Sequence, residues 1–399
     1  MTADQTVAVP AQLKLGGVLI ALLTAISAVG PLAMNGVLPA TTAVMAEFSA
    51  GYGATQLVLT VFLIAILIAQ VIIGRASDRF GRRPVMVASL AAFSAGSSLC
   101  AVAPTLEWLL IARFVQGFGA AACMVLPRTI VRDIYSRDEA ASVIGYMTTA
   151  MMVAPLFGPA LGGWITSHHD WRMMYTGLAI MGAIVMWLAV LKQRETRVLV
   201  AAETSSVPLS STRRLLAERS FVSTVVLFTG SVGVYFTFLA GAPGVAMQSR
   251  GMDPSEYGLW FALVGVGYLS GNLVAGRFSS RLGTQRMIKL GLIPLAAGHA
   301  LFWLLSGIAH PLALFLPMQL CAFSNGMSLP NLMSTIMSVK PSLAGTASGL
   351  AGTVQMGVGV LMTIAVGNLL PFGDVWLFVI LSVCGVLAAV GARMMFSTH

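Results

Sequence analysis

The sequence is a succession of apolar runs of about twenty residues or more, and nearly all charged residues lie between these runs. The run 54–74 contains no charged residue at all. A helix rises about 1.5 Å per residue, so about 20 apolar residues cross a hydrocarbon layer about 30 Å thick. Only 9% of the 399 residues are charged, whereas soluble proteins average about 25%. This chain cannot cover a soluble core with polar side chains, and we expect a protein that crosses the membrane many times.

Twelve spans result when the chain is divided at its charged and Pro- or Gly-rich segments. The spans are too long and too evenly apolar for barrel strands, which alternate over about ten residues. We therefore predict an all-α integral membrane protein with twelve transmembrane helices. The predicted spans are 15–43, 54–74, 85–104, 106–127, 140–164, 172–191, 221–247, 257–276, 287–306, 311–336, 343–367 and 375–396.

The positions of Lys and Arg predict the topology. All 23 of these residues except Arg113, Arg172 and Arg250 fall on the same side of the predicted spans as the N-terminus. By the positive-inside rule, both termini are then cytoplasmic. The net charge of +9 is thus a topology signal. Because no basic patch alternates with aromatic residues in a soluble segment, we expect no nucleic-acid partner.

An internal repeat accompanies the division of the chain into halves. Segment 192–220 is the longest between spans, and we expect it to be a flexible cytoplasmic linker between two pseudo-symmetric six-helix halves, 1–191 and 221–399. Segments 74–84 and 276–286 share Gly, Arg, Ser, Arg and Gly at an offset of 202 residues. Each is the loop that follows the second span of its half, which indicates an internal duplication, as in many secondary transporters. Two unrelated basic turns are the alternative.

These features and three motifs resemble the major facilitator superfamily over essentially the whole chain. Gly74–Pro84 fits its G-x-x-x-D-R-x-G-R-[RK] signature, and Arg113–Ala121 is similar to its R-x-x-Q-G-x-G-A-A element. Ala154–Gly163 is similar to the G-P-x-x-G-G element of drug:proton antiporters. Arg128–Tyr135 and Phe236–Pro243 resemble the bicyclomycin/chloramphenicol-resistance (Bcr/CflA) group. The resemblance implies a transporter that works by alternating access.

The charged motif after the second span is the first candidate site. Asp78 and Arg82 lie four residues apart, and a carboxylate at a turn can accept hydrogen bonds from the N-terminus of a neighbouring helix. The resemblance implies that this neighbour is span 11 and that Arg82 pairs with Asp133, tying the halves together in the outward-open state. A solvated basic turn that only sets topology is the alternative. The predicted gating residues are Gly74, Asp78, Arg79, Gly81, Arg82, Arg83 and Asp133.

The fifth span is the second candidate site. Its two prolines each remove a helical hydrogen bond, and its glycines let another backbone approach closely. We predict a bent helix at a rocking interface between the halves, with ordinary small-residue packing as the alternative. The predicted helix-bending element comprises Pro155, Gly158, Pro159, Gly162 and Gly163.

No carboxylate lies deep in any predicted span. Members of the group that the motifs resemble usually carry an acid in span 1, in a pattern like M-D-x-x-x-P, and here Asn35 holds that place within Met34–Pro39. Because an amide does not carry a proton, the antiport that the resemblance implies lacks its usual carrier. We consider His299, in span 9, as a possible protonation site, with a hydrogen-bonded packing role as the alternative.

Arg113 is the one basic residue inside a predicted span, where a charge is costly. We expect either a functional role or a structural arginine held by backbone carbonyls and Gln116. A cavity with this cation and no acid favours neutral, zwitterionic or anionic compounds over lipophilic cations. The predicted substrate-binding residues, chosen as polar or soft side chains of the inward-facing and flanking spans, are Asn35, Arg113, Gln116, Met124, Met147, Met151, Tyr235, Phe238, Gln319, Asn325 and Gln355.

The sequence thus predicts a monomeric multidrug exporter, associated with antibiotic resistance, in the bacterial cytoplasmic (inner) membrane. Proton antiport is the expected energy source. Export of a sugar, nucleoside or amino-acid derivative, or uncoupled transport, are the alternatives. A membrane sensor on this scaffold would need a sizeable soluble domain, and 192–220 is far too short for one. No enzyme or metal motif is present (G-x-S-x-G, H-E-x-x-H, Walker loop, C-x-x-C), so we expect neither catalysis nor a cofactor or metal.

Overall fold

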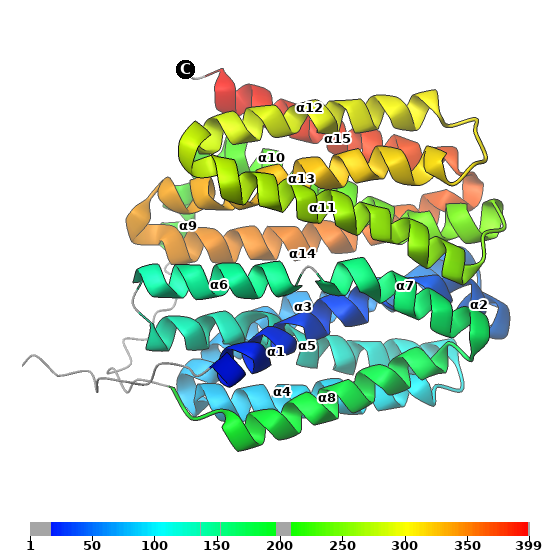
Figure 1. The fold of residues 1–399 in the computed structure, drawn as a ribbon, viewed down its shortest axis with the longest axis horizontal. Helices are drawn as coiled ribbons and strands as arrows, with labels where there is room; N and C mark the ends of the chain where they lie inside the picture. Colours follow the sequence, from blue (N-terminus) through cyan, green and yellow to red (C-terminus); the bar gives the residue numbers. More distant parts are fainter. Residues whose placement is uncertain (1–16, 136, 152, 197–208, 398–399) are drawn as a thin grey trace, which may run out of the picture.

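The computed structural model describes residues 17–135, 137–151, 153–196 and 209–397. Within these ranges the chain is helical apart from short turns, and its helices lie side by side along one axis (Figure 1). Eleven of the described helical stretches are long and apolar enough to cross a membrane. The predicted all-α membrane fold is confirmed.

The first group of helices is built around one central member. It comprises α1 (Gly17–Asn35), η1 (Leu38–Ala40), α2 (Thr41–Glu47), α3 (Tyr52–Phe80), α4 (Arg82–Ala101), α5 (Leu106–Ile134), α6 (Arg137–Met151), α7 (Val153–His168) and α8 (Arg172–Lys192). The central helix α5 lies against α1, α3 and α4, and α8 packs on the far side of α4. The lower part of Figure 1 shows this group.

The second group forms the upper part of Figure 1. It comprises α9 (Leu209–Leu216), α10 (Arg219–Pro243), η2 (Gly244–Ser249), α11 (Pro254–Leu282), α12 (Thr284–Leu304), α13 (Leu312–Ser338), η3 (Pro341–Leu343), α14 (Ala344–Leu369), η4 (Leu370–Phe372) and α15 (Val375–Phe396). α10 packs against α14 and α15, and α13 packs against α11 and α12. α9 contacts α10 and α14. This part of the expected flexible linker is therefore a packed helix, while residues 197–208 lie outside the described residues.

The two repeated segments form one-residue turns, so the prediction of loops there was wrong. α3 and α4 are separated only by Gly81, and α11 and α12 only by Gly283. These glycines have φ angles of 101° and 80°, which a residue without Cβ adopts without strain. The polar residues before each glycine continue the helix beyond its apolar part. The two turns are 202 residues apart, so the repeated sequence corresponds to a repeated helix–turn–helix.

The predicted span 140–164 falls on α6 and α7. α6 ends at Met151 and α7 begins at Val153, and residue 152 lies outside the described residues. α6 and α7 follow one another along the bundle (Figure 1). Eleven of the predicted spans correspond to candidate membrane-spanning stretches among the described residues, and the twelfth, 140–164, contains a residue outside them.

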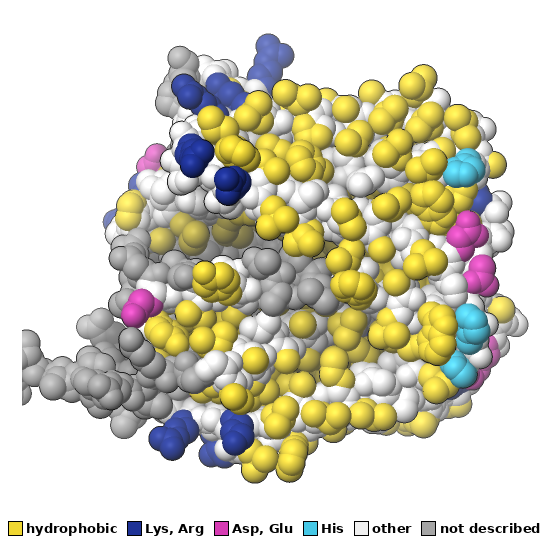
Figure 2. All heavy atoms as spheres, in the orientation of Figure 1, with side chains coloured by type: hydrophobic (Ala, Val, Ile, Leu, Met, Phe, Trp, Pro, Cys, Tyr) yellow, Lys and Arg dark blue, Asp and Glu magenta, His cyan; other side chains and the backbone are white. Residues whose placement is uncertain are grey.

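The two ends of the helix bundle differ in charge. The α3–α4 and α11–α12 turns lie at one end, which we call the basic end because Arg82, Arg83, Arg281 and Arg286 are there. Figure 2 shows Lys and Arg mainly at this end, Asp, Glu and His mainly at the opposite end, and a broad hydrophobic surface between them. This distribution is typical of a protein that spans a bilayer.

Candidate functional site

A cavity of about 430 Å³ lies between the two groups of helices. Its wall comes from α1, α3, α5, α6 and α7 on one side and from α10, α11, α13 and α14 on the other. The wall is mostly apolar, and its uncharged polar side chains include Tyr235, Tyr268, Asn272, Asn325 and Gln355. Figure 2 shows a recess between the groups at the basic end. This volume, with a few polar groups in an apolar wall, is typical of a small-molecule site.

Five predicted substrate-binding residues line this cavity: Met124, Met151, Tyr235, Asn325 and Gln355. Phe238 is fully buried among phenylalanines of α11, α12 and α13, and Met147 is buried in the core. Gln319 lies where α13 meets α11. The predicted residues that do not line the cavity are Asn35, Arg113, Gln116, Met147, Phe238 and Gln319.

Arg128 is the charged side chain that the prediction missed. Among the described residues it is the one charged group in the cavity wall, on the same face of α5 as Met124. The four-residue spacing from Met124 was the available signal. In the sequence, Arg128 counts as one of the basic residues that predict the topology and as the first residue of the segment Arg128–Tyr135 that carries the family resemblance.

Arg113 is a structural brace rather than a cavity residue. Its side chain is fully buried, and Nε donates to the Val58 carbonyl at 3.0 Å. Nη1 donates to Gln116 Oε1 at 2.6 Å and to the Ala33 carbonyl at 3.3 Å. Its guanidinium also lies 4.1 Å from the ring centroid of Phe62. These contacts join α1, α3 and α5, and they match the alternative in which backbone carbonyls and Gln116 hold the charge.

Asn35 joins the two groups of helices beneath the cavity. It is fully buried, and its Oδ1 accepts a hydrogen bond from the Tyr235 hydroxyl of α10 at 3.0 Å. Its Nδ2 donates to the carbonyl of Pro31 at 2.9 Å. Nearby along α3, the Thr60 hydroxyl donates to Thr363 Oγ1 of α14 at 2.9 Å. Asn35 is therefore part of a polar connection between the groups, one residue away from Met34 in the wall.

The groups meet away from the basic end along a seam of close backbone contacts, formed by α7 with α11 and by α3 with α14. A Cβ added at Gly163 would lie 2.9 Å from the carbonyl carbon of Pro254, and one added at Gly258 would lie 2.8 Å from Ala160 Cα. Of the predicted helix-bending element, Gly158 and Gly162 instead approach Gly36 at the end of α1. Small residues thus permit contact both across the seam and within the first group.

Polar contacts reinforce the outer edge of this seam. The Ser167 hydroxyl of α7 donates to Asp253 Oδ1 at 2.6 Å, and the Ser255 hydroxyl donates to the Gly163 carbonyl at 3.3 Å. Asp253 also caps α11 by accepting from the Ser255 N–H at 2.8 Å. The hydrogen bond from Ser167 is the main reason that the pKa of Asp253 lies below its usual range. On α3, the Tyr52 hydroxyl donates to the Ala240 carbonyl of α10.

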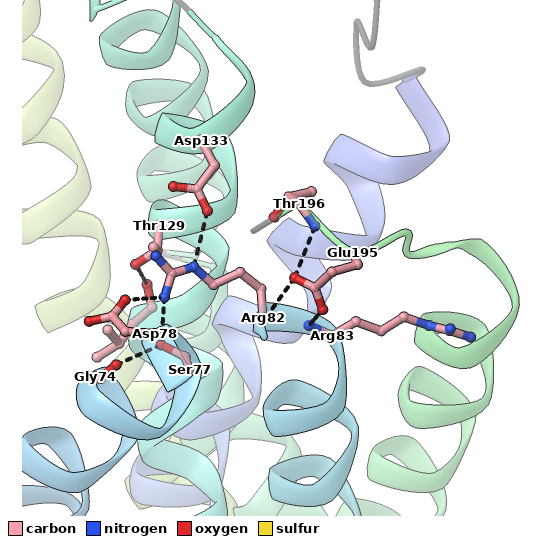
Figure 3. A network of polar contacts seen from close by, with 10 residues as sticks. Gly74, Ser77, Asp78, Arg82, Arg83, Thr129, Asp133, Glu195 and Thr196 are labelled. Atoms are coloured by element: carbon pink, nitrogen blue, oxygen red, sulfur yellow. Dashed lines mark hydrogen bonds and ion pairs between the residues drawn. The ribbon is translucent and has the colours of Figure 1, made fainter. Parts of the chain in front are cut away.

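Arg82 organises a polar network at the basic end (Figure 3). Its Nε donates to Asp133 Oδ2 of α5 at 3.0 Å, the partner that the family resemblance implies. Its Nη1 donates to Ser77 Oγ at 2.9 Å and also to Asp78. The Asp78 side chain is 70% exposed, and none of its contacts with described residues reaches α14. Among the described residues, these contacts of Arg82 connect α3, α4 and α5, and none of them ties the network to α14, which contains span 11.

Glu195, which the prediction did not include, caps α4 beside this network. Its carboxylate accepts from the backbone N–H of Arg82 at 2.8 Å and of Arg83 at 3.1 Å (Figure 3). A Cβ on Gly81 would lie 2.9 Å from the carboxyl carbon of Glu195. Glycine is therefore required here by both the backbone angle and the neighbouring carboxylate. Arg83 itself donates to the carbonyl of Val190 at 2.8 Å.

His299 lies outside the cavity wall, between α12 and α15. Its ring nitrogens are 2.8 Å from the Leu295 carbonyl oxygen and 3.0 Å from the Leu381 carbonyl oxygen. The ring also fills the space against Gly385, where a Cβ would lie 2.6 Å from Cδ2 of the imidazole. These contacts are those of a hydrogen-bonded packing residue.

Comparisons with known proteins agree with this arrangement. The sequence profile of the Major Facilitator Superfamily matches residues 20–363. The chain is 29% identical to the uncharacterized MFS-type transporter YdgK of Bacillus subtilis over 87% of each chain. It is 31% identical to the multidrug resistance protein MdtL of Escherichia coli over 78% of this chain and 79% of that one.

Solved structures show the same fold at low sequence identity. A bacterial homolog of the human lysosomal transporter Spinster, in an inward-facing and unoccupied conformation, superposes with a TM-score of 0.75 at 16% identity, covering 95% of this chain and 97% of that one. The D-xylose-proton symporter superposes with a TM-score of 0.74 at 16% identity, covering 94% and 96%.

Proposed function

We propose that this chain, which belongs to the major facilitator superfamily, is a secondary active exporter of small amphiphilic compounds. The observation that carries the proposal is the cavity between the two groups of helices, mostly apolar and bounded by a packed seam on one side. A site at the junction of two halves suits alternating access, because rocking the halves exposes it to each side in turn. The similarity to a protein named for multidrug resistance supports export of drug-like compounds.

The orientation of the protein follows from its charges. By the positive-inside rule the basic end faces the cytoplasm, and both termini then lie on that side of a bacterial cytoplasmic membrane. The described conformation is accordingly inward-open, with the seam closing the outer side. Compounds would enter the cavity from the cytoplasm and leave after the seam opens.

Proton antiport is the energy source that the Bcr/CflA-like motifs favour. Export of an endogenous metabolite is one alternative, and uncoupled transport is another, which one observation favours. Asn35 stands where the group that the motifs resemble carries an acid, and none of the described residues in the cavity wall is a carboxylate. A carrier without a titratable acid at this place has no evident route for a proton through its binding site.

Transport into proteoliposomes, with and without an imposed pH gradient, separates these mechanisms. Antiport predicts flux that rises with the gradient, and flux that ignores the gradient would exclude it. Asn35→Asp should create or strengthen the pH dependence, because a buried carboxylate beside Tyr235 can take up and release a proton. Asn272→Asp is the matched control. It also replaces an amide by a carboxylate, but at a position of the cavity wall on α11. Equal pH dependence in both variants would contradict a special role for position 35.

A further inference from the structure

The cavity wall is uneven in charge. Arg128 lines it on the first-group side, and the other wall residues are uncharged. Arg128 lies six residues before the end of α5, which places its Cα about 9 Å from the helix end. Its side chain is exposed along the cavity wall, whereas Arg132 lies in the last turn of α5 and outside that wall. A role in topology alone explains a basic residue at the helix end but not one that faces the cavity.

The guanidinium of Arg128 has no carboxylate partner among the described residues. The ion pairs of the basic end involve other cations, chiefly Arg82 with Asp78 and Asp133. The next cation along α5 is Arg132, a like charge that does not compensate Arg128. A cation that faces a mostly apolar cavity without a counter-ion favours a ligand that brings the negative charge itself.

A second polar group in the wall is also incompletely bonded. Asn325 of α13 is 1% exposed, and its Nδ2 donates to the Ser231 carbonyl at 3.0 Å. Its Oδ1 is buried without a hydrogen-bond partner. A buried acceptor without a partner is unfavourable, so a ligand that supplies an N–H or O–H donor gains by occupying this place.

We propose that the cavity binds an anionic amphiphile, with its acid group on Arg128, its apolar body against the Met and Phe side chains, and an N–H or O–H donor on Asn325. This deepens the proposed function, on which it rests in taking the cavity as the transport site. It makes Arg128, instead of Arg113, the residue that selects substrate charge, because Arg113 does not line the cavity and its Nε and Nη1 donate to backbone carbonyls, although its Nη2 is buried without a partner.

Three fluorescent probes with one body and different charge test the proposal: dansylglycine (anion), dansylglycinamide (neutral) and dansylcadaverine (cation). Each carries the same sulfonamide N–H. Binding to the purified full chain is measured by the rise in dansyl fluorescence. Arg128→Gln should weaken dansylglycine binding about tenfold, as expected for a lost charge-assisted hydrogen bond, and change dansylglycinamide binding less than about twofold. Arg128→Lys should keep most of the affinity, since it retains the charge.

Arg132→Gln is the matched control, because it removes the same charge from the same helix outside the cavity wall. It should change dansylglycine binding less than about twofold. The proposal is overturned if both arginine variants weaken binding equally, if Arg128→Gln weakens the neutral probe as much as the anion, or if the wild type binds the anion no better than the neutral probe. Thermal unfolding of each variant shows that it is folded.

The binding result and the proposed export are distinguishable. Suppose that wild type and Arg128→Gln transport dansylglycinamide equally, and that wild type binds dansylglycine no better than dansylglycinamide. The proposed export then stands, and the proposed selectivity for anions is wrong. If dansylglycine binds through Arg128 but no probe crosses the membrane of proteoliposomes, the binding site stands and export falls.

Discussion

The seam between α7 and α11 predicts that a single methyl group changes which conformation the protein populates. A Cβ at Gly163 would lie 2.9 Å from the carbonyl carbon of Pro254 and 3.1 Å from Ser255 Cα, and closer still to the Pro254 oxygen. Carbon atoms in good contact are about 3.5–4 Å apart, so Gly163→Ala requires the helices to separate locally by about 0.5–1 Å. Both opposing groups are backbone and cannot rotate away.

The cost of this overpacking falls on one conformation. Overpacking costs about 1–3 kcal/mol, and here it applies only while the seam is closed. In the outward-open state that we propose, α7 and α11 are apart and the methyl group meets no strain. The ratio of seam-open to seam-closed molecules should therefore rise by about 5- to 150-fold. Gly258→Ala, which meets Pro159 and Ala160 from the other side, should act in the same direction.

Spin labels across the seam measure this shift. His169→Cys and Glu256→Cys place labels beyond the ends of α7 and at the start of α11, and the four native cysteines are all buried. Gly163→Ala should increase the long-distance fraction in a double electron–electron resonance measurement. Gly177→Ala on α8, where a Cβ meets no atom within 4 Å, is the control and should leave the distances unchanged. The reasoning is refuted if Gly163→Ala lowers thermal stability but its distance distribution is the same as that of the Gly177→Ala control.

Three further predictions concern the braces of the fold. Arg113→Met should lower the free energy of unfolding by about 2–4 kcal/mol, measured by thermal unfolding, since it removes a buried cation from three hydrogen bonds. Arg82→Gln should cost about 1–2 kcal/mol in the same assay, whereas the exposed Arg75→Gln should stay within about 0.5 kcal/mol. Folding lowers the pKa of Asp253, so its carboxylate stabilises the closed seam. This stabilisation is present in full above the ordinary Asp pKa and is lost as the pH falls through the pKa of the folded state. The spin-label pair should therefore report more open seam in acid, and Asp253→Asn should remove that part of the pH dependence.

The sequence was sufficient for the membrane class and for the duplication of the segments around Gly81 and Gly283, because these depend on local properties. An apolar run without charges has to span a bilayer, and a glycine at positive φ ends a helix wherever it occurs. Helix ends were predicted less well, since Arg82, Asp133 and similar residues continue helices past the apolar part.

The site was harder to predict because a membrane helix gives little sign of which face it turns inward. In a soluble helix the apolar stripe marks the core, whereas in α5 both the lipid-facing and the packed sides are apolar. The sequence therefore placed Arg113 inside a span and Arg128 just past the end of the same span, but it did not show which of the two faces the cavity. Tertiary packing brings carbonyls of α1 and α3 to the Nε and Nη1 of Arg113, whereas Arg128 lines the cavity.

Arg128 and Asn35 together predict how export could be driven without a proton carrier. A membrane potential, negative inside, favours the outward movement of an anion by about 2.3 kcal/mol per charge and 100 mV. This corresponds to a concentration ratio of about 50-fold across the membrane. An anion bound at Arg128 can therefore be exported against a gradient even though Asn35 replaces the usual acid. In proteoliposomes at equal pH, a potassium diffusion potential should drive dansylglycine toward the positive side and reverse with its sign, while dansylglycinamide flux stays unchanged. If dansylglycine flux instead follows a pH gradient and ignores the potential, a proton carrier exists outside this cavity wall and the argument from Asn35 fails.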